Sequence, residues 1–567
     1  MSNVTPSLLR TAPAVLAVVL AGCGTDVSGP SASLLSCVFT DPVATEVGQV
    51  MQVGGAEVQE VCLAGGVGAD MVYIPFFAVE DEDRELALEV TGAGVVSTGS
   101  ASSSRLEPGA VALSRGSGPA QRYTVDRTFH DRLRQREIRE LEPRIRAGSP
   151  APGLEQARVA ADVPVVGELR DFNVAISCEE VDRRTGRVMY VSERAVIYAD
   201  TANPADLTSQ DYAYFGDRFD DLIYPVETDH FGPPTDIDGN ERSILFFTRA
   251  VNERNPQSAQ SVTIGFFWSG DLFPETDTDR LQACPESNHS EMFYLIAPDP
   301  DGQAGFPFSL EEVRELAIPL IGHEFQHLIN ASRRLFVNQA TAFEAPWLNE
   351  GLSHVAEELI FFAEAGLETG QNIGVDVLRE DSARVDAFNR YMGANFNNYA
   401  KFLSRPDTAS LMGPPNDLAT RGAAWGFLRY AADRSGSGDE AFFFDVVNGR
   451  VAGLDNLDDL LGDGETLRWM QDWTVSIYSD DLVPGLDPRF EMDTWDLRSV
   501  YGGSTLEEYP LQVVELGGSR TDSYDLPGGG TLFSRFGVAS DARAVIHVTA
   551  EGRAPPRTLR GSFIRVR

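Results

Sequence analysis

The chain has 567 residues, a length that predicts about three or four folded units. Hydrophobic residues make up 43% of it and charged residues 23%, which is ordinary for a globular protein. The 85 acidic residues outnumber the 46 basic ones, and the net charge of -39 argues against electrostatic binding of nucleic acid or of an anionic membrane surface. We expect this surplus to serve solubility; the alternative is attraction of cationic substrates or divalent metals.

The N-terminus has the pattern of an export signal. In residues 1–22, Arg10 precedes an apolar run over residues 12–20 that is too short to span a bilayer. The run leads to a Leu-Ala-Gly-Cys sequence ending at Cys23, which resembles a bacterial lipobox. This predicts a lipid on Cys23, a flexible tether over residues 23–36, and a place in the bacterial cell envelope, on the outer membrane or the cell surface. The alternative is a secreted protein cut nearby, with Cys23 a free thiol.

The remaining cysteines also indicate export. They are Cys37, Cys62, Cys178 and Cys284. An even number in an oxidising compartment predicts two disulfides, with three connectivities open. Pairing nearest neighbours gives Cys37–Cys62 and Cys178–Cys284. The spacings do not match a C-x-x-C metal or redox site, so we interpret these residues as structural.

One β-rich segment and a charged segment are predicted between the tether and residue 158. Residues 37–118 alternate short β-like runs, such as 71–77 and 86–90, with glycine turns, which predicts a small β-sandwich domain. Residues 119–157 form a charged linker, in which 125–147 is dense in Arg and Glu. Opposite charges three and four residues apart predict a solvent-exposed connecting helix there.

Mixed strand and loop signals follow to about residue 300. The strand candidates are residues 243–250, 264–268 and 292–297. Between them, Asp236, Asp238 and Asn240 alternate around a glycine turn and offer oxygen ligands for calcium. A plain Asx turn without an ion is the alternative, since the full twelve-residue calcium loop is lacking.

A helix carrying a metal motif is predicted from residue 309. Ser309 and Glu312 form a capping box, and apolar residues follow at helical spacing. Pro319 predicts a kink or a helix restart near 315–319. Beyond it stands H-E-x-x-H, with His323, Glu324 and His327. Two histidines four residues apart share one helix face, so both imidazoles can reach one ion.

A second helix supplies the third candidate ligand, which is acidic. Pro346 can occupy the first position of a helix in the sequence P-W-L-N-E-G-L-S, and Glu350 lies in its first turns. Imidazole and carboxylate ligands with one open position suit zinc. The alternatives are core histidines without a metal, and Glu350 as an acid favoured at a helix N-terminus.

Helical signals continue to about residue 480. The segment around Trp425 is predicted to form a core helix without a functional role. Short strands and glycine turns return over residues 505–567, for example at 528–533, and predict a second small β domain.

The pairing of H-E-F-Q-H-L-I with W-L-N-E-G-L-S resembles the gluzincin zinc peptidases, most closely the hyicolysin-like family. The string W-L-N-E-G is also similar to the aminopeptidase N family. The resemblance implies His323, His327 and Glu350 as zinc ligands and Glu324 as the general base.

The resemblance also concerns the residues that could orient the ligands or add to them. The aminopeptidase pattern places an orienting glutamate at Glu357, although Glu357 could instead face solvent, because one of the pair Glu357 and Glu358 should point outward. Thermolysin-like enzymes carry an aspartate where this chain has His354, so that variant is not matched. His354 as a fourth ligand would close the position that water needs.

The predicted fold class is α+β. A gluzincin-type domain over residues 158–504, with a mixed upper lobe and a helical lower lobe, is flanked by small β-sandwich-like domains. The predicted function is zinc-dependent hydrolysis of protein or peptide substrates outside the inner membrane by a monomer, with Glu324 activating the water that attacks the scissile carbonyl. No G-A-M-E-N string is present, which favours an endopeptidase.

Two other functions stay open: a non-enzymatic surface lipoprotein that binds a partner through its β domains, and a zinc hydrolase of a non-peptide bond. The donor for the oxyanion also stays open. The candidates are Tyr391, Tyr399, Arg421 and His289.

Overall fold

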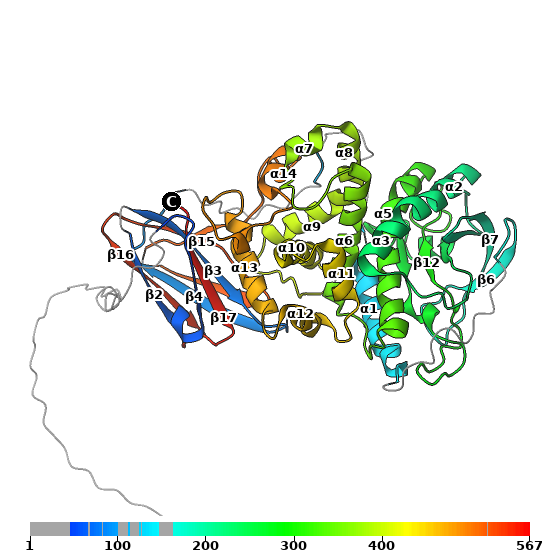
Figure 1. The fold of residues 1–567 in the computed structure, drawn as a ribbon, viewed down its shortest axis with the longest axis horizontal. Helices are drawn as coiled ribbons and strands as arrows, with labels where there is room; N and C mark the ends of the chain where they lie inside the picture. The colour runs from blue at the N-terminus through cyan, green and yellow to red at the C-terminus, as the bar shows by residue number, and fades with distance from the viewer. Residues whose placement is uncertain are drawn as a thin grey trace, which may run out of the picture.

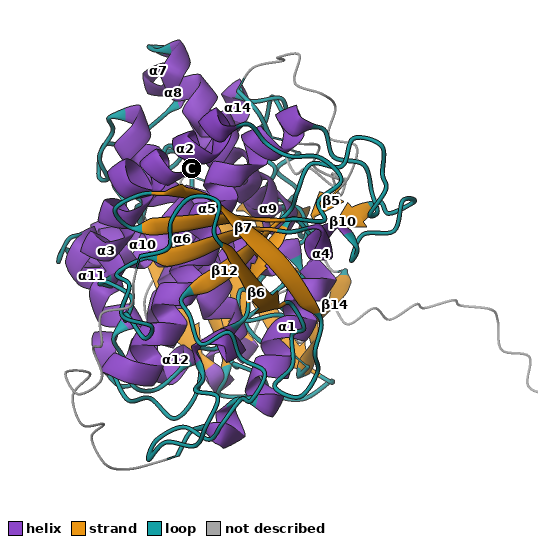
Figure 2. Cartoon of the chain, turned by 90° about the vertical axis from the view of Figure 1, so that its right-hand side faces the viewer, coloured by secondary structure: helices purple, strands orange, loops and turns teal. Residues whose placement is uncertain are grey.

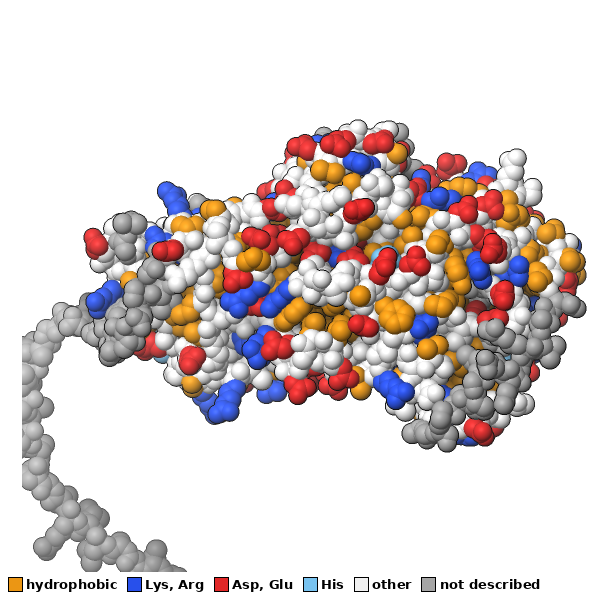
Figure 3. All heavy atoms as spheres, viewed as in Figure 1, with side chains coloured by type: hydrophobic (Ala, Val, Ile, Leu, Met, Phe, Trp, Pro, Cys, Tyr) orange, Lys and Arg blue, Asp and Glu red, His pale blue; other side chains and the backbone are white. Residues whose placement is uncertain are grey.

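The computed structural model describes residues 46–65, 68–81, 83–99, 111–113, 124–125, 127–146, 163–414, 416–518 and 520–567. Three regions follow one another along its longest axis, namely a β-sandwich, a helical region and a mixed sheet region (Figure 1). On the face drawn in Figure 3, acidic side chains are scattered over all three regions. Among the described residues, no helix combines the length and apolar character needed to cross a membrane.

The β-sandwich is built from both ends of the chain. Its first sheet has the order β1-β17-β3-β15-β13 and its second the order β14-β4-β16-β2. The strands are β1 (Val50–Gly54), β2 (Glu60–Ala64), β3 (Ala69–Phe77), β4 (Glu85–Ala93), β13 (Val514–Glu515), β14 (Thr521–Pro527), β15 (Ser534–Val538), β16 (Arg543–Ala550) and β17 (Leu559–Arg565). Alternate residues of β4 and β16 are buried, so the inner faces of the two sheets share one core.

This arrangement corrects the prediction of two flanking β domains. N-terminal and C-terminal strands alternate in both sheets, so residues 37–118 and 505–567 contribute to a single sandwich. Each segment offers isolated amphipathic strands whose apolar faces become buried only against the other. The glycine turn expected within residues 528–533 is present, because these residues form the turn and connection between β14 and β15.

The mixed region holds a six-stranded sheet of order β11-β12-β9-β8-β7-β6. Its strands are β6 (Leu169–Asn173), β7 (Arg183–Val191), β8 (Ala195–Asp200), β9 (Ser243–Phe247), β11 (Gly265–Phe267) and β12 (Met292–Leu295). The helices α2 (Ser209–Arg218), α3 (Tyr224–Phe231) and α4 (Arg249–Asn252) connect them. The predicted disulfide Cys178–Cys284 is present, and Figure 2 shows the sheet in front of the helices. Cys62 is also disulfide-bonded, whereas Cys37 and Cys23 lie outside the described residues.

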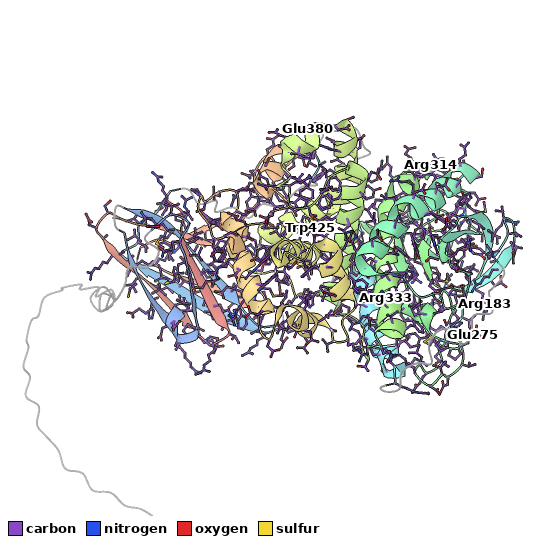
Figure 4. All side chains as sticks on the ribbon, viewed as in Figure 1. Arg183, Glu275, Arg314, Arg333, Glu380 and Trp425 are labelled. Carbon is purple, nitrogen blue, oxygen red and sulfur yellow. A yellow bond between two sulfur atoms is a disulfide. The ribbon has the colours of Figure 1, made fainter. Side chains whose placement is uncertain are left out.

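The helical region begins with α5 (Leu310–Ser332) and α6 (Pro346–Ala365), which pack together, while α5 also contacts β11 and β12. The other helices are α7 (Val375–Arg379), α8 (Ser382–Ala387), α9 (Gly393–Leu403), α10 (Leu418–Ser435), α11 (Asp439–Val447), α12 (Gly453–Leu461), α13 (Thr466–Ser479) and α14 (Leu497–Gly503). Trp425 lies buried on α10 in the middle of this region (Figure 4). The mixed and helical regions agree with the α+β expectation. The restart predicted at Pro319 does not occur, since α5 is assigned as one continuous helix.

The charged segment before residue 158 forms α1 (Arg127–Glu140). The helix and its charge pairs are as predicted, with Arg136 and Glu140 3.3 Å apart. The predicted solvent exposure is wrong, however, because Leu133, Arg134 and Glu137 are buried, the latter two against the mixed region. Charge density alone could not show that Leu133 gives this helix an apolar side.

Candidate functional site

The two site helices begin where their sequences predict. The Ser309 hydroxyl accepts the Glu312 N–H at 3.2 Å, and the Glu312 carboxylate accepts the Ser309 N–H at 2.8 Å, which closes the capping box of α5. Pro346 occupies the first turn of α6. The N-terminal half of α6 then faces the C-terminal half of α5, which places Glu350 opposite the two histidines of H-E-x-x-H.

His323, His327 and Glu350 each offer one ligand atom, and these atoms lie within 4.8 Å of one another. His323 Nε2 is 3.6 Å from Glu350 Oε2, and His327 Nε2 is 3.7 Å from Glu350 Oε1. Atoms each about 2.1 Å from one tetrahedral ion lie about 3.4 Å apart, so the spacing is close to that of zinc ligands. All three residues are buried, and His323 Nε2 has no hydrogen-bond partner among the described residues. Buried ligand atoms that lack hydrogen-bond partners are what a metal site requires, so this group fits a metal ion.

The electrostatics of Glu350 and His327 fit ligation, whereas His323 must first give up a proton. Burial opposes the ionisation of Glu350, but Arg421, with which it forms an ion pair, and the two histidines hold its pKa well below the ordinary value. Burial and Arg134 hold the pKa of His327 well below its ordinary value, which keeps the imidazole neutral. Burial also lowers the pKa of His323, but Glu350 and Glu357 outweigh it and raise the pKa to about 9. An anionic carboxylate and a neutral imidazole are the forms that bind metals.

A carboxylate fixes the orientation of His323. Its Nδ1 lies 2.8 Å from Glu357 Oε1, while the other oxygen of Glu357 lies 3.1 Å from His354 Nδ1. Glu357 is 8% exposed and Glu358 is fully buried, so the expectation that one of the pair faces solvent is wrong. Glu358 instead accepts a 2.7 Å hydrogen bond from Trp495 Nε1 on the opposite side of α6.

The sequence analysis missed the partners of His327. Its Nδ1 lies 3.1 Å from Asn349 Oδ1 and 3.1 Å from the Ser353 hydroxyl. Asn349 directly precedes Glu350, and Ser353 lies one helical turn after Asn349. This spacing is the signal that could have found them. The partners fix the ring plane of His327 as Glu357 fixes that of His323.

Glu324 directly follows His323 in the chain and is not one of the three candidate ligands. The side chain is fully buried, and its carboxylate oxygens have no hydrogen-bond partner among the described residues. Burial raises the pKa of Glu324, and His323 and Arg134 reduce this effect. A buried carboxyl with a raised pKa next to a metal-type cluster is suited to accept and return a proton.

Helix α1 contributes groups that the sequence analysis did not place here. Arg134 Nη2 donates to the Phe267 carbonyl at 3.0 Å, and Glu137 Oε1 accepts the Ser269 N–H at 2.8 Å. Beside these contacts is a cavity of only ≈ 10 Å³, which Asn330 and Asn349 also line. Helix α1 therefore lies against β11 and close to the cluster.

The other residues predicted for the site either lie outside the cluster or contact one of its ligands in a different role. Of the four oxyanion candidates, Arg421 contacts the cluster through Glu350. Tyr391 donates instead to Glu364, and Tyr399 packs against Trp425. Among described residues, a second set that could hold a metal is His323, His354 and Glu357, but two hydrogen bonds already join its members.

Comparison with known proteins gives one informative relative. The chain is 23% identical over 198 residues to the neutral metalloprotease ShpI of Staphylococcus hyicus, an alignment that covers 34% of this chain and 40% of that protein. It therefore spans about two fifths of the relative's length. No family model matches the chain. The distant likeness and the His–His–Glu cluster together support a metallopeptidase, for which zinc is the typical metal.

Proposed function

We propose that the chain is a zinc-dependent endopeptidase of the hyicolysin-like type. The observation that carries the proposal is the buried set of His323, His327 and Glu350 with Glu324 beside it. The likeness to a metalloprotease supports the peptide bond as the target. These three residues would hold the metal, and the ion would supply Lewis acidity when bound.

The protein's own side chains carry the rest of the reaction. Glu324 takes a proton from the attacking water and returns it to the leaving amine. Glu357 and Asn349 fix the orientation of the two ligand imidazoles, and Arg421 balances the charge of Glu350. Protein or peptide chains are the substrates. We place the enzyme in the bacterial cell envelope as a monomer, anchored through Cys23, on the strength of its sequence alone.

The proposal is tested with protein that starts after residue 23. Zinc is counted by mass spectrometry, and cleavage of casein and of a peptide library is compared with that of Glu324→Gln. We expect one zinc per chain in both proteins, internal cleavage by the parent, and a loss of about 10²–10⁴-fold in kcat for the variant. Bound zinc without cleavage by the parent refutes the peptidase, and no bound zinc refutes the metal site.

A further inference from the structure

A second group of carboxylates lies away from the zinc-type cluster, in the sheet region. Asp236 and Asp238 stand in the loop between α3 and β9, and Glu291 directly precedes β12. One carboxylate oxygen from each lies within 4.8 Å of the others. Strands β9 and β12 are parallel neighbours, so the three acids meet at the amino ends of two adjacent strands.

Glu291 is the unusual member of this group. It is 2% exposed, and its Oε1 accepts the Ile237 N–H at 2.6 Å. Its Oε2 is buried and has no hydrogen-bond partner among the described residues. A buried carboxylate oxygen without a donor is costly unless a cation or a proton meets it.

The surroundings of the group favour a cation. Arg170 is the nearby guanidinium, and its hydrogen bonds go to the Asn288 carbonyl and the Ser290 hydroxyl. Asn240, predicted as a third oxygen ligand, instead donates its amide to Asp238 Oδ2 at 2.7 Å and thereby orients that carboxylate. The Asn240 carbonyl oxygen Oδ1 accepts the Arg242 N–H at 2.6 Å. Glu291 joins Asp236 and Asp238 in the cluster, which sequence spacing could not reveal because Glu291 is more than fifty residues from them.

We propose that Asp236, Asp238 and Glu291 bind a calcium ion. Oxygens at 2.3–2.6 Å from one Ca²⁺ lie at most about 5 Å apart, and the observed cluster meets this limit. Calcium accepts irregular sets of carboxylates from loops, whereas magnesium demands a near-ideal octahedron. The same loop donates the Thr235 N–H to Ser332 at the end of α5. The ion therefore ties this loop to the start of β12 and supports the end of the helix that carries His323 and His327.

The test uses zinc-replete protein freed of calcium on a chelating resin, with zinc then restored. Terbium luminescence, sensitised by the neighbouring Tyr198 and Tyr224, reports binding, and calcium and magnesium compete for the ion. We expect one saturable terbium site, displacement by calcium well before magnesium, and a Tm rise of about 2 °C or more with calcium.

Matched variants locate the site. Glu291→Gln keeps the acceptor for Ile237 but removes the charge, and we expect it to lose at least about tenfold in calcium affinity. Asp238→Asn is a second loss variant, in case the first folds poorly. Glu241→Gln removes an acid of the same loop outside the cluster and should bind as the parent does. An absence of saturable binding, binding retained by both loss variants, or equal competition by magnesium overturns the proposal.

Discussion

Replacing Glu357 tests how strongly a carboxylate that touches no metal controls the metal site. The residue bridges His323 Nδ1 at 2.8 Å and His354 Nδ1 at 3.1 Å in a buried setting. Loss of such a partner typically weakens metal binding 10–100-fold, or about 1.4–2.7 kcal/mol. Glu357→Gln keeps an oxygen for His323 but loses the charge, so we expect the lower end of this range. Glu357→Ala leaves both imidazoles without their acceptor, and we expect the upper end.

Zinc affinity is measured by competition with a chromophoric chelator at constant pH near neutrality. Glu358→Gln is the matched control, because it neutralises the adjacent buried glutamate, whose contacts are with Trp495 and Arg429. The reasoning is refuted if folded Glu357→Ala binds zinc as tightly as the parent, or if Glu358→Gln weakens zinc binding to the same extent.

Three further predictions concern stability. Burial raises the pKa of Glu358 to about 7, above the unfolded value of 4.5, so the parent loses up to about 3 kcal/mol of unfolding free energy as pH rises through this window. Glu358→Gln does not titrate, so its stability relative to the parent should increase over the same window in denaturant titrations, and a constant difference contradicts the shift. Gly422→Ala should destabilise by about 1–3 kcal/mol in the same titrations, because the new Cβ would lie 2.2 Å from the Asn398 carbonyl carbon, and unchanged unfolding refutes this packing. Replacing Cys178 and Cys284 by serine opens a loop with a sequence separation of 106 and should cost about 2–5 kcal/mol, seen as a lower Tm that matches the reduced parent.

Local patterns predicted the site because its chemistry lies in two short strings. The spacing of His323 and His327 fixes their common helix face, and Pro346 fixes where α6 begins, so both site helices followed from the sequence. The approach of Glu350 to the histidines came from a resemblance and not from the spacing itself. Asn349 was missed, and Arg421 was considered as an oxyanion donor and not as the partner of Glu350, since these roles depend on how α6 meets α5 and α10.

Long-range pairing is what the sequence could not supply. The strands of residues 50–93 and 514–565 were recognised as β structure, but strand order depends on contacts between segments more than four hundred residues apart. Helix α1 shows the same limit, because a charged helix carries no local sign that its Arg134 meets Phe267. Glu291 was not found beside Asp236 and Asp238 for the same reason.

The shared sandwich makes the chain behave as a closed loop. Strand β4 is held by β14 and β16, and β1 is held by β17, so the two ends of the molecule are joined without a covalent bond. One backbone cut between β4 and β13 would therefore leave both fragments associated through these strand pairs. A chain nicked once would separate on a denaturing gel but keep its size in native solution.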